Sequence, residues 1–198
     1  MLALERLNAG SVHRDAELKE LDAKGLELVD LEFDSCRFVD CSFAGATLRR
    51  VRFTDCSFEG CDLTAAKFTG SRLRGVSFKS CRAGGANWAA ASSLDDLSFD
   101  HCLLDQGTFA GAKLPRLKLD DCRLRGADFS EADLRSSTVT RCDLAQARFF
   151  GADLSGADLR GSFSYEIDAF RTKIKKARFS LPEAVSLLHG LDIILEDS

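Results

Sequence analysis

The chain is poor in proline, tyrosine, tryptophan and methionine, and it lacks any long apolar run. Its 198 residues include two Pro and one each of Tyr, Trp and Met, whereas Phe occurs 15 times. A secretory signal needs an apolar segment of about 7–15 residues, and a membrane span needs about 18. Neither segment is present in the sequence. We therefore expect a cytoplasmic protein that does not span a membrane.

An excess of positive charge is also lacking. The chain has 27 basic and 31 acidic residues, which gives a formal net charge of −4. Nucleic-acid-binding domains usually carry a clear surplus of Lys and Arg on one face. The charge balance thus predicts no direct contact with nucleic acid. At 45% hydrophobic residues the chain can bury a core of its own, and we expect one domain.

Motifs for catalysis and metal binding are missing as well. The sequence has no P-loop, no G-x-G-x-x-G after a strand, no G-x-S-x-G and no H-E-x-x-H. The histidines at 13, 101 and 189 have no candidate nucleophile beside them, and no C-x-x-C pair occurs. We predict no catalytic residue, no cofactor-binding residue, no metal ligand and no cofactor. A non-enzymatic protein is therefore expected.

Large apolar residues recur at every fifth position along most of the chain. They keep one phase up to Trp88 and resume one residue later from Leu94. A period of five matches neither a helix, at 3.6, nor a simple strand, at 2.0. It predicts a solenoid, whose units bury their inward side chains only by stacking on one another. The series is Leu28, Phe33, Phe38, Phe43, Leu48, Phe53, Phe58, Leu63, Phe68, Leu73, Phe78 and Trp88, then Leu94, Phe99, Leu104, Phe109, Leu114, Leu119, Leu124, Phe129, Leu134, Val139, Leu144, Phe149, Leu154 and Leu159.

The position two residues before each large one is small, most often Ala or Cys. All eight cysteines occupy this position. A free Cys behaves as a small buried apolar residue, so packing accounts for all of them. An inward ladder of thiols offers no tetrahedral zinc site, although adjacent rungs would be close enough for adventitious disulfides. The cysteines are Cys36, Cys41, Cys56, Cys61, Cys81, Cys102, Cys122 and Cys142.

These repeats resemble those of the pentapeptide repeat proteins, whose unit reads A-(D/N)-L-x-x. The segments GADFSEADLR at 126–135 and ADLSGADLRG at 152–161 each match the unit twice. The resemblance covers 26–162 and implies an all-β solenoid, a right-handed quadrilateral β-helix with four units per coil. Positions four units apart then form columns of similar side chains, provided that one residue is added across a register slip near 89–93.

The two ends of the chain depart from the repeat. Residues 1–25 predict a helical or irregular N-terminal cap, and 163–198 predict a C-terminal capping and dimerisation module. In that module Ser180 and Glu183 form a capping box, so a short α-helix is expected over 181–189. Its apolar residues exceed what one cap requires, which favours a homodimer over a capped monomer. The predicted dimer interface comprises Val185, Leu188, Leu191, Ile193 and Leu195.

The tail SYEIDAFRTKIKKARFSLPEAVSLLHGLDI also resembles one group of pentapeptide repeat proteins. Members of that group bind DNA gyrase or topoisomerase IV and confer resistance to quinolones or albicidin, and the likeness is closest to the albicidin-resistance member. The resemblance implies a tail-to-tail dimer that mimics duplex DNA and protects the topoisomerase from poisons. Some quinolone-resistance members have long loops, whereas one extra residue is the sole interruption here. A loop-free rod would have to act through its coil faces and through the shape of the dimer.

The acidic residues gather in the second half of the repeat. Residues 94–162 hold 12 acidic and 9 basic residues, whereas 26–93 hold 8 and 9. Mimicry of DNA requires rows of negative charge. The alternatives are that these carboxylates only keep the surface soluble, and that the chain is a generic interaction scaffold with an unrelated partner. The predicted partner-binding acidic face comprises Asp95, Asp96, Asp100, Asp105, Asp120 and Asp121.

Overall fold

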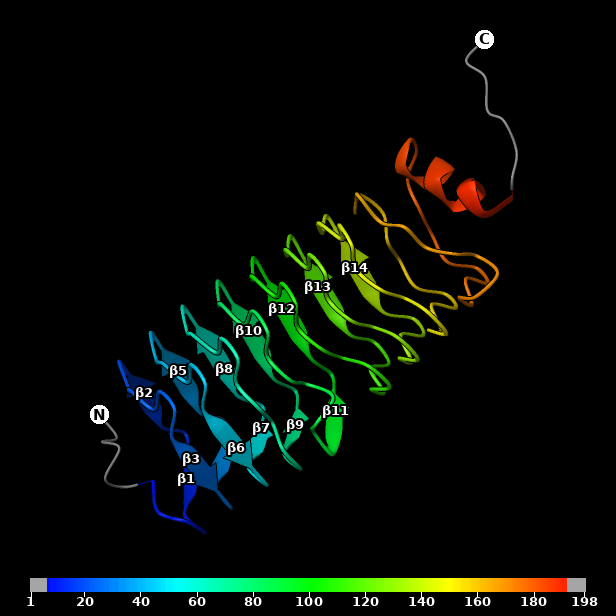
Figure 1. The fold of residues 1–198 in the computed structure, drawn as a ribbon. Helices are drawn as coiled ribbons and strands as arrows, with labels where there is room; N and C mark the ends of the chain where they lie inside the picture. The colour runs from blue at the N-terminus through cyan, green and yellow to red at the C-terminus, as the bar shows by residue number, and fades with distance from the viewer. Residues whose placement is uncertain (1–6, 192–198) are drawn as a thin grey trace.

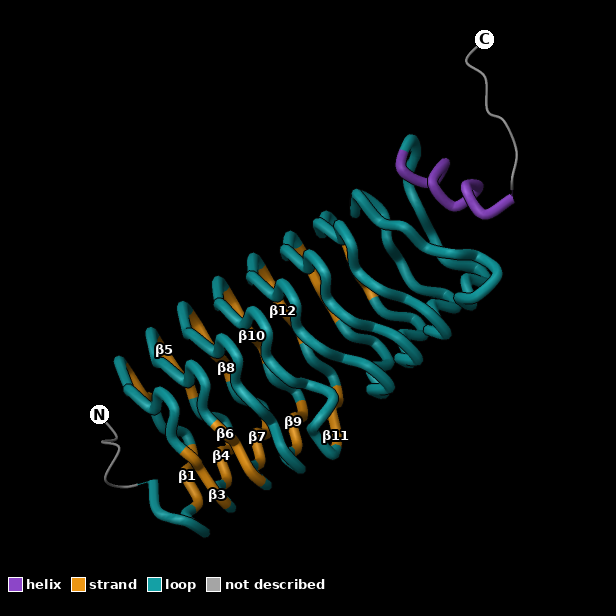
Figure 2. Tube along the Cα trace, viewed as in Figure 1, coloured by secondary structure: helices purple, strands orange, loops and turns teal. Residues whose placement is uncertain are grey.

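The computed structural model describes residues 7–191, which wind into a rod of stacked coils (Figures 1 and 2). Its strands are three residues long, and each pairs in parallel with a strand one coil away. Phe33 pairs with Phe53, and Phe38 with Phe58, so one coil consists of four pentapeptide units. The predicted right-handed quadrilateral β-helix is confirmed. The N-terminal strands and the C-terminal helix lie at opposite ends of the rod.

Four faces follow one another around each coil, and we number them in chain order. Face 1 is a parallel sheet of β1 (Val12–Arg14), β4 (Glu32–Asp34), β7 (Arg52–Thr54), β9 (Arg72–Arg74) and β11 (Ser93–Asp95). Face 2 contains β2 (Glu17–Lys19), β5 (Arg37–Val39), β8 (Ser57–Glu59), β10 (Ser77–Lys79), β12 (Ser98–Asp100), β13 (Lys118–Asp120) and β14 (Thr138–Thr140). Face 3 is a column of isolated bridges from Asp22 to Phe163. Face 4 begins with β3 (Glu27–Val29) and β6 (Thr47–Arg49) and continues as bridges to Arg148.

Columns of aromatic rings fill the interior. The middle residue of a strand points inward, and its neighbours point outward, because successive side chains alternate between the two sides of a strand. On face 2 the rings of Phe38 and Phe58 stack with centroids 4.4 Å apart, and those of Phe58 and Phe78 with centroids 4.9 Å apart. On face 4 the ring of Trp88 stacks between those of Phe68 and Phe109. Stacking across coils explains why the sequence uses so much Phe.

The small inward position also carries hydrogen bonds. The Cys102 thiol donates to the carbonyl of Phe78, and the Cys102 amide donates to the Cys122 sulfur. Ser71 occupies the same kind of position, where its hydroxyl donates to the Leu48 carbonyl at 2.7 Å and accepts from the Val51 amide at 2.9 Å. Cysteine therefore suits this position because it is small, apolar and still able to donate weakly to a carbonyl. All eight thiols are free and buried.

The structure confirms the one-residue slip after Trp88. Leu73 pairs with Leu94, and Phe78 with Phe99, so these partners are one residue further apart along the chain than partners in the preceding coils. The Ser92 hydroxyl donates to the carbonyls of Gly70 and Ser71, which fixes the extra residue against the preceding coil. Beyond it, the pairing of Phe99 with Leu119 restores the regular spacing.

The coil begins earlier than the sequence indicates. Strands β1 and β2 lie within residues 1–25, where we expected a helical or irregular cap. Two atypical inward residues hide this coil from the five-residue pattern. His13 occupies one of the positions where the period expects a large apolar residue; it pairs with Phe33 and stacks on its ring at 5.3 Å. Ala23 occupies another such position, ten residues later. Leu21 is buried where a small residue is usual, which offsets the missing volume at Ala23.

At the other end, residues 183–191 form a 3₁₀ helix, η2 (Glu183–Leu191), instead of the expected α-helix over 181–189. The Val185 amide donates to the Pro182 carbonyl, the three-residue spacing of a 3₁₀ turn. The capping box does not form. The Ser180 hydroxyl accepts from the Gly161 amide, and the Glu183 carboxylate accepts from the Ser164 amide. Both side chains thus bind the helix to the last coil.

The last coil is irregular between residues 163 and 172. Tyr165 and Ile167 are buried there, one residue and two residues away from the positions that the period predicts. The chain rejoins the regular coil when Lys173 pairs with Asp153. This irregular turn leaves Phe170 at the surface, 71% exposed.

Candidate interaction surfaces

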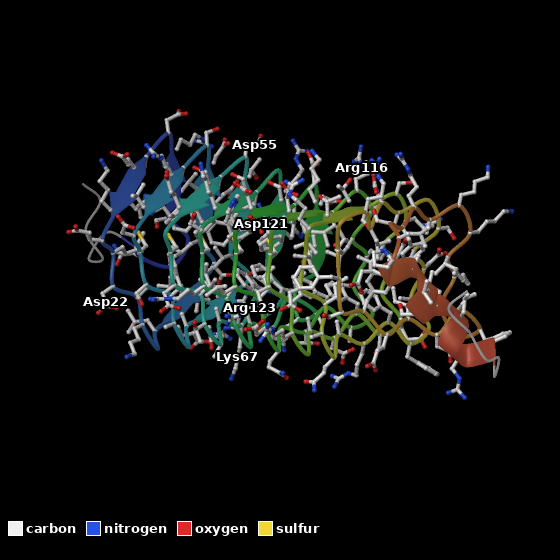
Figure 3. The ribbon with its side chains drawn as sticks, turned by 90° about the horizontal axis from the view of Figure 1, so that it is seen from above. Asp22, Asp55, Lys67, Arg116, Asp121 and Arg123 are labelled. Carbon is white, nitrogen blue, oxygen red and sulfur yellow. The ribbon has the colours of Figure 1, made fainter. Side chains whose placement is uncertain are left out.

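Charged side chains cover the outside of the rod along its length (Figure 3). Many basic residues pair with an acidic residue one coil away. Arg50 pairs with Asp30 at 2.6 Å, and Arg148 with Asp128 at 2.9 Å. Such exposed pairs contribute about 0.2–1 kcal/mol each to stability, but they cancel much of the surface charge. Groups of unbalanced charge are therefore the candidate binding surfaces.

One unbalanced group lies at the corner between faces 2 and 3, and we name it the acidic corner: Asp100, His101, Asp120 and Asp121. Strands β12 and β13 place Asp100 directly beside Asp120. The His101 ring lies between two carboxylates, with Nδ1 2.7 Å from Asp100 and Nε2 2.9 Å from Asp121. The hydrogen bond with Asp100, together with the negative charges around the ring, raises the pKa of His101.

Asp120 is partly neutralised from the following coil. Its carboxylate accepts a hydrogen bond from the Thr140 hydroxyl at 2.7 Å and a second from the Arg141 guanidinium. The acidic corner contains three carboxylates, and the positive groups that can offset them are Arg141 and, when protonated, His101. With Arg141 included, its net charge is negative when His101 is neutral and becomes less negative, but does not vanish, when His101 is protonated.

The other three predicted acidic residues lie elsewhere. Asp95 and Asp96 belong to face 1, where the Asp95 carboxylate accepts from the Ser93 hydroxyl at 2.8 Å. Asp105 follows face 3 and accepts from Arg123 Nε at 2.6 Å. The structure thus brings together three of the six residues and spreads the rest over two other faces. The interpretation from sequence missed the basic partners, although aligning the sequence coil by coil places Arg141 and His101 next to these carboxylates.

The second candidate surface lies at the C-terminal end, which we name the apolar tail: Leu181, Val185 and Leu188. Their exposed fractions are 80%, 38% and 36%. The neighbouring Leu187 packs against the core together with Phe179. Of the predicted interface, Leu191 ends η2, whereas Ile193 and Leu195 lie outside the described residues.

Within residues 7–191, no group of three or more His, Cys, Asp and Glu side chains is arranged to hold a metal ion. Over the same range, none of the helices has the length and apolar character that crossing a membrane requires.

Sequence comparison gives the same result as the repeat pattern. A family model described as "Pentapeptide repeat region" matches residues 31–92, and one described as "Pentapeptide repeats (8 copies)" matches 92–130 and 127–163. A search of curated proteins found no match.

Among solved structures, the chain is similar to full-length QnrB1, described as a plasmid-mediated fluoroquinolone resistance protein. The TM-score is 0.73 at 21% identity, over 97% of this chain and 94% of QnrB1. A trypsin-treated form of QnrB1 gives a TM-score of 0.72 at 20% identity, over 95% of this chain and 99% of that one. At this level of identity the likeness establishes a shared fold. The repeat pattern, the coil and the matched models together show that the chain belongs to the pentapeptide repeat family.

Proposed function

We propose that two copies of this chain form a non-enzymatic, cytoplasmic rod that binds DNA gyrase or topoisomerase IV and protects it from a poison of the quinolone or albicidin type. The observation that carries the proposal is the likeness to QnrB1 along nearly the whole of both chains, because QnrB1 is described as a fluoroquinolone resistance protein. The resemblance of the tail at 164–193 to the gyrase-binding group supports the same activity.

The acidic corner supplies the negative charge that such a partner would recognise. A topoisomerase binds duplex DNA through basic groups that contact rows of phosphates. Coils repeat about every 4.8 Å along the rod, so Asp100 and Asp120 place carboxylates at this spacing, and Asp121 adds a third at the same corner. The corner therefore offers a short row of negative charge.

The direct test is a gyrase supercoiling assay in which this protein is titrated against a fixed inhibitory concentration of ciprofloxacin or of albicidin. We expect supercoiling to recover as the protein concentration rises. The triple variant D100N/D120N/D121N should require a clearly higher concentration for the same recovery. Absence of both rescue and binding to gyrase or topoisomerase IV would contradict the proposal.

Asp40 provides a matched control for the acidic corner. It occupies the same turn position on face 2 as Asp121, four coils closer to the N-terminus, and has a left-handed backbone, with φ of 52° against 50°. Asn tolerates this conformation, so both substitutions preserve the turn. D40N should rescue supercoiling as well as the natural chain. If D40N and the triple variant lost the same amount of supercoiling rescue, the total charge of the chain would matter and the position of the acidic corner would not.

Dimerisation through the apolar tail is tested separately. We expect Leu188→Asp to give a monomer in light scattering, because burying a carboxylate in an apolar interface costs several kcal/mol. Leu103 on face 3 is a matched control, since it is 38% exposed against 36% for Leu188. Leu103→Asp should leave the mass unchanged. A natural chain that is monomeric at assay concentrations, or a Leu188→Asp variant that stays dimeric, would refute this interface.

A scaffold for an unrelated protein is the second candidate. The ion pairs between coils favour it, because they leave little net charge for mimicry of DNA. Affinity capture from a cell extract distinguishes the two candidates. Recovery of another protein without gyrase or topoisomerase IV subunits would support the scaffold.

A further inference from the structure

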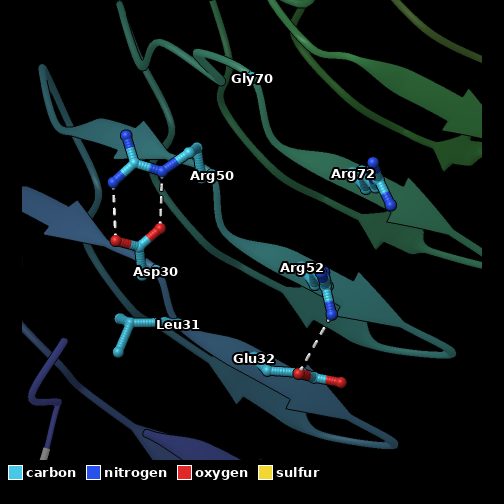
Figure 4. A pocket seen from close by; sticks show the side chains of 7 residues that line it. All are labelled: Asp30, Leu31, Glu32, Arg50, Arg52, Gly70 and Arg72. Carbon is cyan, nitrogen blue, oxygen red and sulfur yellow. Dashed lines mark hydrogen bonds and ion pairs between the residues drawn. The ribbon is translucent and has the colours of Figure 1, made fainter. Parts of the chain in front are cut away.

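A groove crosses the edge between faces 4 and 1 in the N-terminal third of the rod (Figure 4). It has a volume of about 310 Å³ and is lined by Asp30, Leu31, Glu32, Arg50, Arg52, Gly70 and Arg72. Three guanidinium groups face two carboxylates, so the lining has a surplus of positive charge. This part of the rod is remote in sequence from the acidic corner and from the apolar tail.

The three arginines differ in how far they are neutralised. Arg50 is fully paired, with Nε and Nη2 2.7 Å and 2.6 Å from the two oxygens of Asp30. Arg52 is loosely paired, because its nearest carboxylate oxygen, on Glu32, lies 3.6 Å away. Within residues 7–191, the Arg72 guanidinium makes no hydrogen bond or ion pair. Figure 4 shows this gradient, with dashed lines at Arg50 and Arg52 and none at Arg72.

Strand pairing places the two less neutralised arginines next to each other. Arg52 and Arg72 are register partners in β7 and β9, and the next partner along the ladder is Ser93, which is uncharged. Like charges directly opposite each other in a sheet destabilise it. Elsewhere on the rod an acidic residue one coil away usually balances an arginine, as Asp30 balances Arg50. An anion seated between Arg52 and Arg72 would supply the missing balance.

Gly70 keeps the groove open. It occupies the turn position that Asp30 and Arg50 hold in the two preceding coils, and a Cβ atom there would lie 3.6 Å from Arg50 Cγ. Because Gly70 has no side chain, this turn contributes only backbone atoms to the lining of the groove. The groove is therefore accessible to a small ligand.

From this geometry we propose that the groove binds a phosphate dianion, either free or as a monoester, between Arg52 and Arg72. Each guanidinium presents a planar fork of donors that fits two oxygens of an oxyanion. The strands that carry the two forks are adjacent and lie about 4.8 Å apart, so the forks can engage different oxygens of one tetrahedral phosphate. A single carboxylate has two oxygens and fits one fork. The site is independent of topoisomerase binding.

The test is a titration of inorganic phosphate into the full chain at constant ionic strength, followed by calorimetry and by amide NMR shifts. Phenyl phosphate serves as the monoester in a parallel titration. We expect saturable binding with shifts centred on Arg52, Gly70 and Arg72, and the tighter of the two ligands identifies the natural source. Binding that does not saturate, or that potassium chloride at the same ionic strength reproduces, would overturn the proposal.

Three variants make the test specific. R72Q should weaken phosphate binding by about tenfold or more, the effect of losing a hydrogen bond to a charged group. E32Q should strengthen binding, because it removes a competing carboxylate. R116Q is the matched control, since Arg116 is an exposed arginine that follows face 1 and has no ion pair within residues 7–191. Equal weakening in R116Q and R72Q would mean general attraction without a site, and melting curves would verify that each variant is folded.

Discussion

Replacing Phe58 in the middle of the face 2 column tests what holds the rod together. Its side chain is 2% exposed and contacts four other rings. It stacks on Phe38 and Phe78 with centroids 4.4 Å and 4.9 Å away, and its edge meets Phe53 and Phe43 at 5.4 Å and 6.0 Å. Truncating a buried Phe to Ala removes its transfer free energy and leaves a cavity, at a cost of about 3–5 kcal/mol. We expect Phe58→Ala to lower the free energy of unfolding by this amount.

Phe58→Leu separates the contribution of volume from that of the rings. Leu already occupies the same column at Leu18, Leu119 and Leu159, so the coil accepts its shape. The substitution keeps most of the apolar volume but loses the ring pairs, each of which contributes about 0.5–1.5 kcal/mol beyond burial. Since these terms are not additive, we expect a total loss of about 1–2 kcal/mol.

Guanidinium unfolding should be followed by far-UV circular dichroism and by the fluorescence of Trp88, which is buried in the column of the opposite face and contacts Phe78. Coincident transitions are required, because a linear array can unfold in stages. Ser57→Ala, on the outer side of the same strand, should change stability by less than about 0.5 kcal/mol. If Phe58→Ala costs clearly less than about 3 kcal/mol, the buried column does not hold the rod together. If Phe58→Leu costs nothing, the ring pairs add nothing to the burial of apolar volume.

Three further outcomes follow from local geometry. The pKa of His101 should exceed its ordinary value in an NMR titration, because of its hydrogen bond with Asp100, and Asp100→Asn should lower that pKa. The stabilisation that protonated His101 gains from Asp100 is complete below about pH 6.5 and is lost as pH rises through the raised pKa. Burial raises the pKa of Cys56 to about 12, so a thiol reagent at neutral pH should label it only after unfolding, and rapid labelling of the native chain would contradict the structure. Gly45 and Ala65 hold the same turn in successive coils with φ of 67° and 55°; Gly45→Ala should destabilise by about 1 kcal/mol and Ala65→Gly should stabilise by a similar amount in thermal melts.

The coil could be predicted from sequence because the types of side chain repeat with the same period as the coil. Each unit places one large and one small residue inward, and these residues are buried only when the units stack. The pattern of large and small residues therefore implies the stacked coil by itself. Even the slip near 89–93 was readable, because Leu94 restarts the series one residue late. The pattern failed where a different residue fills the inward space, as His13 and Ala23 do in the first coil.

The ends and the surface were less predictable, because they depend on contacts between distant residues. Ser180 and Glu183 have the sequence of a capping box, yet their side chains bind the Gly161 and Ser164 amides. Local spacing cannot reveal that a neighbouring coil competes for the same groups. The charge on Asp120 likewise depends on Arg141, which belongs to the following coil.

The regular length of the coil also makes the protein a molecular ruler. Removing residues 38–57 would join Arg37 to Phe58 with every column still in phase, and it would shorten the rod by one step of about 4.8 Å. The same excision across the slip would have to remove one residue more, since Leu73 pairs with Leu94. The distance between the two ends of the rod therefore changes in steps of one coil. A partner that binds both ends would fit only a rod with the matching number of coils.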